Sequence, residues 1–103
     1  WWLYRMDDQW EKFGPGEDVD LSLSPTEYFL RQCYISVDAD EALAEDVVKR
    51  LGDDNIVFST DYPHPDSAYP NATKEILSID GLSSRSKKKI LWDNCVRLYG
   101  LQA

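Results

Sequence analysis

An aspartate and the only histidine of the chain lie three residues apart in the stretch FSTDYPHPDS, residues 58–67. Asp61 follows an apolar run, and His64 stands between Pro63 and Pro65. A carboxylate can ligate zinc or manganese, or act as a general base toward a water that a metal activates. An imidazole can be a further ligand or an acid–base group. These two side chains are therefore the first candidates for a catalytic or metal-binding site.

A catalytic zinc site needs more ligands than this pair. Such sites usually take three protein side chains and a water. One histidine and two separated cysteines, Cys33 and Cys95, do not complete that set. We therefore expect this chain alone not to bind zinc tightly. The alternative for Asp61 is structural, with its carboxylate accepting hydrogen bonds from nearby amides of a surface loop.

The candidate site follows a predicted strand. Two apolar, partly β-branched runs are typical of buried strands, CYISV at 33–37 and NIVFST at 55–60. Between them, Asp38 with Glu41 three residues later predicts a capping box at the start of a helix. Gly52 stands where the C-terminal cap of that helix belongs. The order is therefore strand, helix, strand.

This order predicts where the candidate side chains lie. Two buried strands joined by a helix are expected to be parallel, with a right-handed connection. In parallel α/β architectures, ligands bind beyond the carboxyl ends of the strands. Asp38 and Asp61 occupy that position on the two strands. Asp38 is thus a second candidate, with helix capping as its structural alternative.

Further helices complete an α/β fold. Caps and apolar spacing predict helices over 3–13, 24–31, 71–79 and 83–100. The second of them begins at a capping box formed by Ser24 and Glu27. Two parallel strands leave both edges without partners. We therefore expect either that more chain precedes Trp1 or that another copy supplies the rest of the sheet.

Composition argues against several classes of partner. The 103 residues include 19 acidic and 11 basic side chains, a net charge of −8, so a basic face for nucleic acid is not expected. No stretch approaches 18 consecutive apolar residues, so no membrane span is expected. The two cysteines do not make a disulfide framework. We expect free, buried thiols and a cytoplasmic location.

Several segments together resemble a known family. TDYPH at 60–64 and DNCVRLYGL at 93–101 resemble the C-terminal end of the amidohydrolase-related family. This family of metal-dependent hydrolases and decarboxylases includes aminocarboxymuconate semialdehyde decarboxylase. WWLYRMDDQWE at 1–11 is similar to the family's helix after the sixth strand, and CYISVDADE at 33–41 to its seventh strand and the following helix.

The resemblance implies a (β/α)₈ TIM barrel of which residues 1–103 form the C-terminal part. That part would hold the helix after strand six, then strands seven and eight with their helices, about two βα units with extra helices. Asp61 matches the aspartate at the end of the eighth strand, which ligates or faces a divalent metal, with zinc the expected ion, and handles a proton. His64 would lie at the rim of the site. The family's other histidine ligands are absent, so this chain alone is expected to be inactive.

Two functions stay open at the level of sequence. The first is the C-terminal segment of a metal-dependent hydrolase or decarboxylase that acts on a small carbonyl or carboxylate substrate, with Asp61 and His64 as catalytic residues and Asp61 at the metal. The second is a non-catalytic interaction module, or an inactive fragment, that oligomerises through exposed strand edges. A homo-oligomer is expected in either case. Neither the substrate nor the choice between hydrolysis and decarboxylation follows from the sequence.

Overall fold

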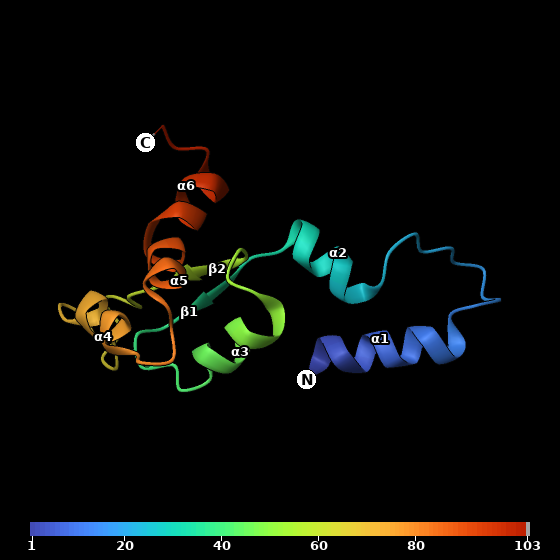
Figure 1. The fold of residues 1–103 in the computed structure, drawn as a ribbon, viewed down its shortest axis with the longest axis horizontal. Coiled ribbons are helices and arrows are strands. Elements are labelled where there is room, and N and C mark those ends of the chain that lie inside the picture. The colour runs from blue at the N-terminus through green and yellow to red at the C-terminus, as the bar shows by residue number, and fades with distance from the viewer. Residues whose placement is uncertain (103) are drawn as a thin grey trace. The chain divides into compact units, whose positions relative to one another are not determined.

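The computed structural model describes residues 1–102, and these divide into two compact units on either side of the Tyr34–Ile35 peptide. The first unit contains two helices, α1 (Trp2–Phe13) and α2 (Pro25–Gln32). The second contains a two-stranded sheet with helices (Figure 1). Within residues 1–102, no helix combines the length and the apolarity needed to cross a membrane.

In the first unit, α1 and α2 pack against each other. The predicted capping box is confirmed, because the Glu27 amide donates to Ser24 Oγ (3.2 Å) and the Ser24 amide donates to Glu27 Oε2 (2.8 Å). The Thr26 amide in the same turn donates to Asp7 Oδ1 of α1 (2.8 Å). One turn of α2 therefore provides both its own cap and a hydrogen bond to the neighbouring helix.

The second unit contains the predicted strand–helix–strand order. Strands β1 (Ile35–Val37) and β2 (Ile56–Phe58) pair in parallel, with Ile35 opposite Ile56 and Val37 opposite Phe58. Helix α3 (Ala44–Leu51) connects them. Both strands are shorter than the apolar runs from which they were predicted. The expected mixed α/β class is confirmed, with a two-stranded parallel sheet.

The start of α3 differs from the expectation. The Asp38–Glu41 capping box does not form, and the helix begins at Ala44 after Leu43, without a side-chain cap. The Glu41 amide instead donates to the Asp38 main-chain carbonyl (3.3 Å), which makes a turn. The Asp38 carboxylate is thereby left out of the helix start.

The remaining helices continue from the loop after β2. They are α4 (Ala72–Ser78), α5 (Ser84–Lys88), the π-helical segment η1 (Lys89–Asp93) and α6 (Asn94–Tyr99). The predicted helix over 83–100 is thus divided by a π-helical stretch. Its ends are as expected, because Ser83 Oγ accepts from the Ser86 amide (3.0 Å) and Gly100 has a positive φ of 62°.

The core lies in the second unit, between the sheet and the helices. Its buried members are Val37, Ala39, Ala44, Ile56, Ala72, Ile76, Leu82 and Ile90. The expectation of buried thiols is wrong for Cys33, which is exposed, while Cys95 is partly buried. Cys33 is exposed because β1 begins only at Ile35, so this residue ends α2 instead of entering the sheet.

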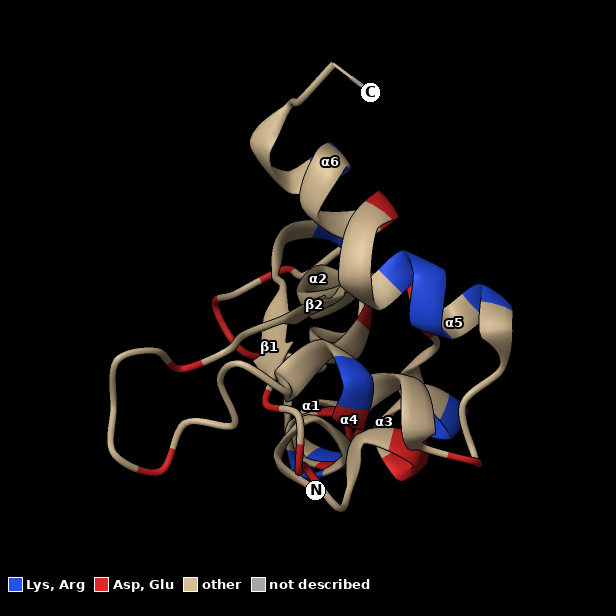
Figure 2. Ribbon diagram, turned by 90° about the vertical axis from the view of Figure 1, so that its left-hand side faces the viewer, with Lys and Arg blue, Asp and Glu red and all other residues tan. Residues whose placement is uncertain are grey.

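Lys and Arg residues gather on α5 and the start of η1, which are coloured blue in Figure 2. The Lys89 ammonium contacts Asp53 (2.6 Å) and Asp54 (2.8 Å), and Lys87 Nζ donates to the Leu77 carbonyl (2.8 Å). Lys87 and Lys89 therefore form contacts inside the chain.

Candidate functional site

The structure brings the two candidate aspartates to one hollow. Asp38 follows β1 and Asp61 follows β2 after two residues, and parallel strands place both at the same edge of the sheet. The hollow has a volume of about 100 Å³. It is lined by Asp38, Ala39, Asp40, Thr60, Asp61, Asp66, Ser67 and Ala68. Four aspartates therefore line one small hollow. Sequence reasoning had placed two of them, Asp38 and Asp61, at strand ends.

The loop after β2 is fixed by hydrogen bonds within itself. Asp61 has a φ of 53°, a conformation that aspartate tolerates better than most residues. Its amide donates to Ser59 Oγ (3.1 Å), and its carbonyl accepts from the His64 amide (2.9 Å). The Ser67 hydroxyl reaches back to the Thr60 carbonyl (2.5 Å) and closes the loop. Asp61 is thus held by the chain on both sides of it.

Asp61 and His64 form a hydrogen-bonded pair. His64 Nδ1 lies 2.9 Å from each carboxylate oxygen of Asp61. This hydrogen bond, then the charge of Asp61 and that of Asp66, raises the pKa of the His64 imidazole above its ordinary value. Because the carboxylate is an acceptor, Nδ1 carries a proton and Nε2 is the ring atom that faces other groups. A His–Asp pair of this kind can orient an acid–base group.

A third residue joins the pair. Oxygen or nitrogen ligand atoms of Asp61, His64 and Asp66 all lie within 4.8 Å of one another. Three protein ligands are the number that a catalytic zinc takes, and carboxylate with imidazole suits zinc or manganese. The donor types of this cluster, two carboxylates and an imidazole, therefore suit a divalent cation.

Sequence reasoning did not name Asp66 as a candidate ligand. The signal was the Asp-x-x-His-x-Asp spacing in a loop with two prolines. The three side chains cluster only because the chain makes two turns. In the first, the His64 amide donates to the Asp61 carbonyl, and in the second, the Ser67 amide donates to the His64 carbonyl (3.1 Å). The expectation of weak zinc binding by this chain alone stays a prediction.

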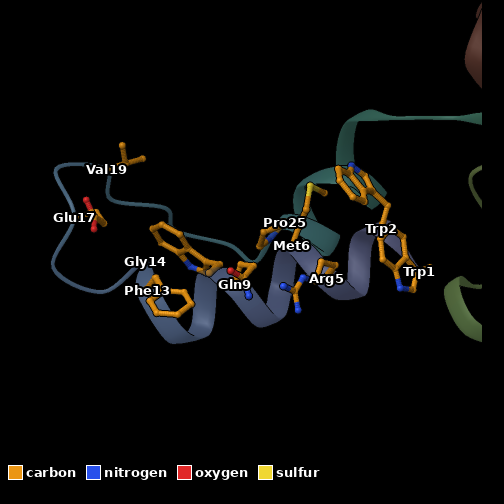
Figure 3. Close-up of a pocket in the computed structure, with 11 residues that line it drawn as sticks. Trp1, Trp2, Arg5, Met6, Gln9, Phe13, Gly14, Glu17, Val19 and Pro25 are labelled. Carbon is orange, nitrogen blue, oxygen red and sulfur yellow. The ribbon is translucent and has the colours of Figure 1, made fainter.

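A second hollow, of about 790 Å³, lies within the first unit. It is lined by Trp1 and by side chains of α1, among them Trp2, Arg5, Met6 and Phe13 (Figure 3). Its walls are mainly apolar, and none of the candidate aspartates or His64 contributes to it. This groove therefore offers a mainly apolar contact surface.

Comparisons with known proteins give a matching family model and a similar solved structure. A family model described as Amidohydrolase matches residues 1–101. The crystal structure of 5-carboxyvanillate decarboxylase LigW from Sphingomonas paucimobilis is similar, with a TM-score of 0.76 and 25% sequence identity. The match covers 98% of this chain and 30% of that one, so the chain spans about a third of the length of the decarboxylase. No match was found among curated proteins.

Proposed function

This chain belongs to the amidohydrolase family, and we propose that it forms the C-terminal part of a metal-dependent hydrolase or decarboxylase. In this proposal residues 1–103 are the end of a (β/α)₈ barrel, with β1 and β2 as its seventh and eighth strands. The barrel end that carries the carboxyl termini of the strands then holds the active site.

One observation carries the proposal. Asp61 stands beyond the carboxyl end of β2, is locked in a positive-φ conformation and is hydrogen-bonded to the only histidine of the chain. Strained residues of this kind persist where the surrounding structure holds them, and they cluster at functional sites. A purely structural role, in which the Asp61 carboxylate only accepts hydrogen bonds from backbone amides, does not account for its hydrogen bond with His64.

A divalent metal, with zinc the expected ion, would be held by Asp61 together with ligands from the rest of the barrel. Asp66 and His64 are the further ligands that this chain can offer. A bound metal supplies Lewis-acid polarisation of a carbonyl or carboxylate oxygen. Asp61 accepts or delivers a proton at its carboxylate, and His64 holds that carboxylate in place from the rim.

The substrate is proposed to be a small molecule with a carbonyl or carboxylate group. The similar structure is that of an enzyme named for decarboxylating 5-carboxyvanillate, an aromatic acid. That likeness favours decarboxylation of an aromatic carboxylate over hydrolysis. A cytoplasmic location and a homo-oligomeric assembly belong to the same proposal.

The test uses the complete reading frame that encodes these 103 residues. We expect the expressed protein to contain a divalent metal and to turn over an aromatic carboxylate. Asp61→Ala should lower kcat about 10²- to 10⁴-fold, the range typical of a lost acid–base group, with the fold retained. Asp80→Ala, at an exposed aspartate after α4, is the matched control and should leave turnover unchanged.

Unchanged turnover in Asp61→Ala would remove this residue from the mechanism. A reading frame that begins at the Trp1 codon would instead favour the second candidate, an interaction module. The observation on its side is the exposed apolar surface formed by Trp1 and by Trp2 and Phe13 of α1. Under that candidate, the chain should sediment as an oligomer, and Asp61→Ala should not change its assembly.

A further inference from the structure

One peptide group in the loop after β2 is held at both of its polar atoms by serine side chains. It is the peptide that joins Thr60 to Asp61. Its carbonyl accepts a hydrogen bond from the Ser67 hydroxyl (2.5 Å), and its amide donates to Ser59 Oγ (3.1 Å). Both serines are partly buried. Two hydroxyls therefore fix the plane of the peptide that precedes the candidate catalytic residue.

The orientation of this peptide decides where the Asp61 side chain lies. Asp61 has a φ of 53°, which L residues adopt rarely. Because φ relates the preceding peptide to the Cα atom, a peptide that is free to turn lets Asp61 return to a negative φ. That rotation would move its carboxylate relative to the hollow that it lines. The His64 amide restrains the other side of Asp61, at its carbonyl (2.9 Å), so the two serine hydroxyls supply the restraint on φ.

The Ser67 hydroxyl is fully used by these backbone bonds. A serine hydroxyl has one proton to donate. That proton is directed at the Thr60 carbonyl, while the hydroxyl oxygen accepts from the Tyr69 amide (3.2 Å). Ser67 also lines the acidic hollow, but to act there as a nucleophile it would have to give up its bond to Thr60. Its bonds indicate that it holds the two ends of the loop together.

We infer that Ser67 and Ser59 are positioning residues, which act through the Thr60–Asp61 peptide to hold the Asp61 carboxylate toward the hollow and His64. The catalytic part of this inference rests on the proposed function, and the part that concerns the loop does not. Groups that react must be held within about 0.5 Å of their productive geometry. Loosening this peptide should therefore slow the chemical step more than it weakens substrate binding.

The part that concerns the loop is tested by amide hydrogen exchange, followed by NMR in the 103-residue chain without metal or substrate. Ser67→Ala removes the bond to the Thr60 carbonyl and leaves Ser59 in place. We expect the Asp61 amide to exchange at least about tenfold faster, although its own acceptor is unchanged, because local opening exposes it. Ser67→Thr keeps a hydroxyl and should stay within about threefold of the unmodified chain.

Ser78→Ala is the matched control. The Ser78 hydroxyl also donates to a backbone carbonyl, that of Glu75 (2.7 Å), but in α4. Its removal should leave the exchange of the Asp61 amide unchanged. An unchanged rate in a folded Ser67→Ala chain, or an equally fast exchange in Ser67→Thr, would overturn the inference.

A second variant decides if Ser67→Ala does not fold. Ser59→Ala releases the same peptide at its amide. The His64 amide, on the other side of Asp61, should then exchange faster as well, since the restraint on φ is lost. An unchanged rate at the His64 amide would overturn the inference.

The catalytic part is tested in the protein expressed from the complete reading frame, with an aromatic carboxylate as substrate. Ser67→Ala should lower kcat at least about tenfold while KM changes less than about twofold, and Ser67→Thr should restore most of kcat. Ser78→Ala should change neither constant. An unchanged kcat in Ser67→Ala would overturn the positioning role.

The two tests separate this inference from the proposed function. If the complete protein proves inactive, faster exchange in Ser67→Ala still supports the hold on Asp61. If the complete protein is active and the Asp61 amide exchanges at the same rate with and without the Ser67 hydroxyl, the proposed function stands and the inference is overturned.

Discussion

Asn94 shows how one residue can connect segments that are distant in sequence. It begins α6 and is 1% exposed. Its side-chain amide donates to the carbonyls of Asp53 (2.7 Å) and Ile56 (2.6 Å). Asp53 lies just before β2, and Ile56 is the first residue of that strand. Asn94 therefore fixes the last helix to the strand that positions Asp61.

Replacing Asn94 should destabilise the second unit. Asn94→Ala leaves the buried Ile56 carbonyl and that of Asp53 without their donor, and each lost partner of this kind costs about 1–3 kcal/mol. We expect a loss of roughly 2–4 kcal/mol in the free energy of unfolding. Urea denaturation measures this loss in the free energy of unfolding. Asn71→Ala, at an exposed asparagine without a side-chain cap bond, is the control and should change it by less than about 0.5 kcal/mol.

Asn94→Asp should be at least as harmful as Asn94→Ala. It puts a carboxylate against two carbonyl oxygens in a buried place, where an unpaired charge is costly. An Asn94→Asp chain as stable as the natural one would contradict the role assigned to the amide donor.

At the scale of elements, an ion pair joins η1 to the loop between α3 and β2. Lys89 Nζ contacts Asp53, and both side chains are largely buried. The hydrogen bond from Lys89 is the main cause that holds the pKa of the Asp53 carboxyl below its ordinary value, and the Ser86 hydroxyl adds to it. Asp54 is a second, more exposed partner of Lys89.

This pair predicts a pH-dependent contribution to stability. The pKa of Asp53 is lower in the folded than in the unfolded chain, so the contribution is present above the unfolded pKa of about 4. This contribution to stability is lost as the pH falls through the lower pKa that Asp53 has in the folded chain. Lys89→Met should therefore destabilise the chain at pH 7, with the difference shrinking below about pH 4.

Urea denaturation of both chains at pH 3, 4, 5 and 7 measures this difference. Lys74→Met, at an exposed lysine of α4, provides the comparison and should show little effect at any of these values. A penalty for Lys89→Met that stays constant from pH 7 to pH 3 would mean that packing of the lysine stem, and not its charge, stabilises the junction.

At the scale of the whole molecule, the two units differ in how they are held together. In the second unit Ile56, Ile76 and Ile90 are almost completely buried. In the first unit α1 has no buried residue. Stability should therefore reside in the second unit, which carries the candidate site.

Adjacent positions on α4 test this distribution. Ile76 is 0% exposed and Leu77 is 52% exposed. Ile76→Ala removes buried methyl groups and leaves a cavity, for which we expect a loss of about 2–5 kcal/mol in the free energy of unfolding. Leu77→Ala should cost less than about 1 kcal/mol, because its side chain is half in solvent. Similar losses at both positions, measured by urea denaturation, would contradict the described core.

Sequence patterns were reliable where the interaction is local. The Ser24–Glu27 box, the Ser83 cap and the end at Gly100 were all predicted, and each involves groups at most four residues apart. The Asp38–Glu41 box has the same spacing and does not form. There the chain between β1 and α3 makes a turn first, which a capping motif alone does not reveal.

The sequence by itself determined the α/β class, the order strand–helix–strand, the family and the choice of Asp61 and His64 as candidates. The class, the order and the candidates follow from side-chain chemistry and from periodicity within short windows. The family follows from the resemblance of segments such as TDYPH and DNCVRLYGL. Only the tertiary structure decided that Asp38 and Asp66 share a hollow with Asp61, that Tyr62 and Tyr69 meet, and that Asn94 anchors α6. These contacts depend on the path of the backbone between distant positions, because loop turns and strand pairing set that path and no local window contains it.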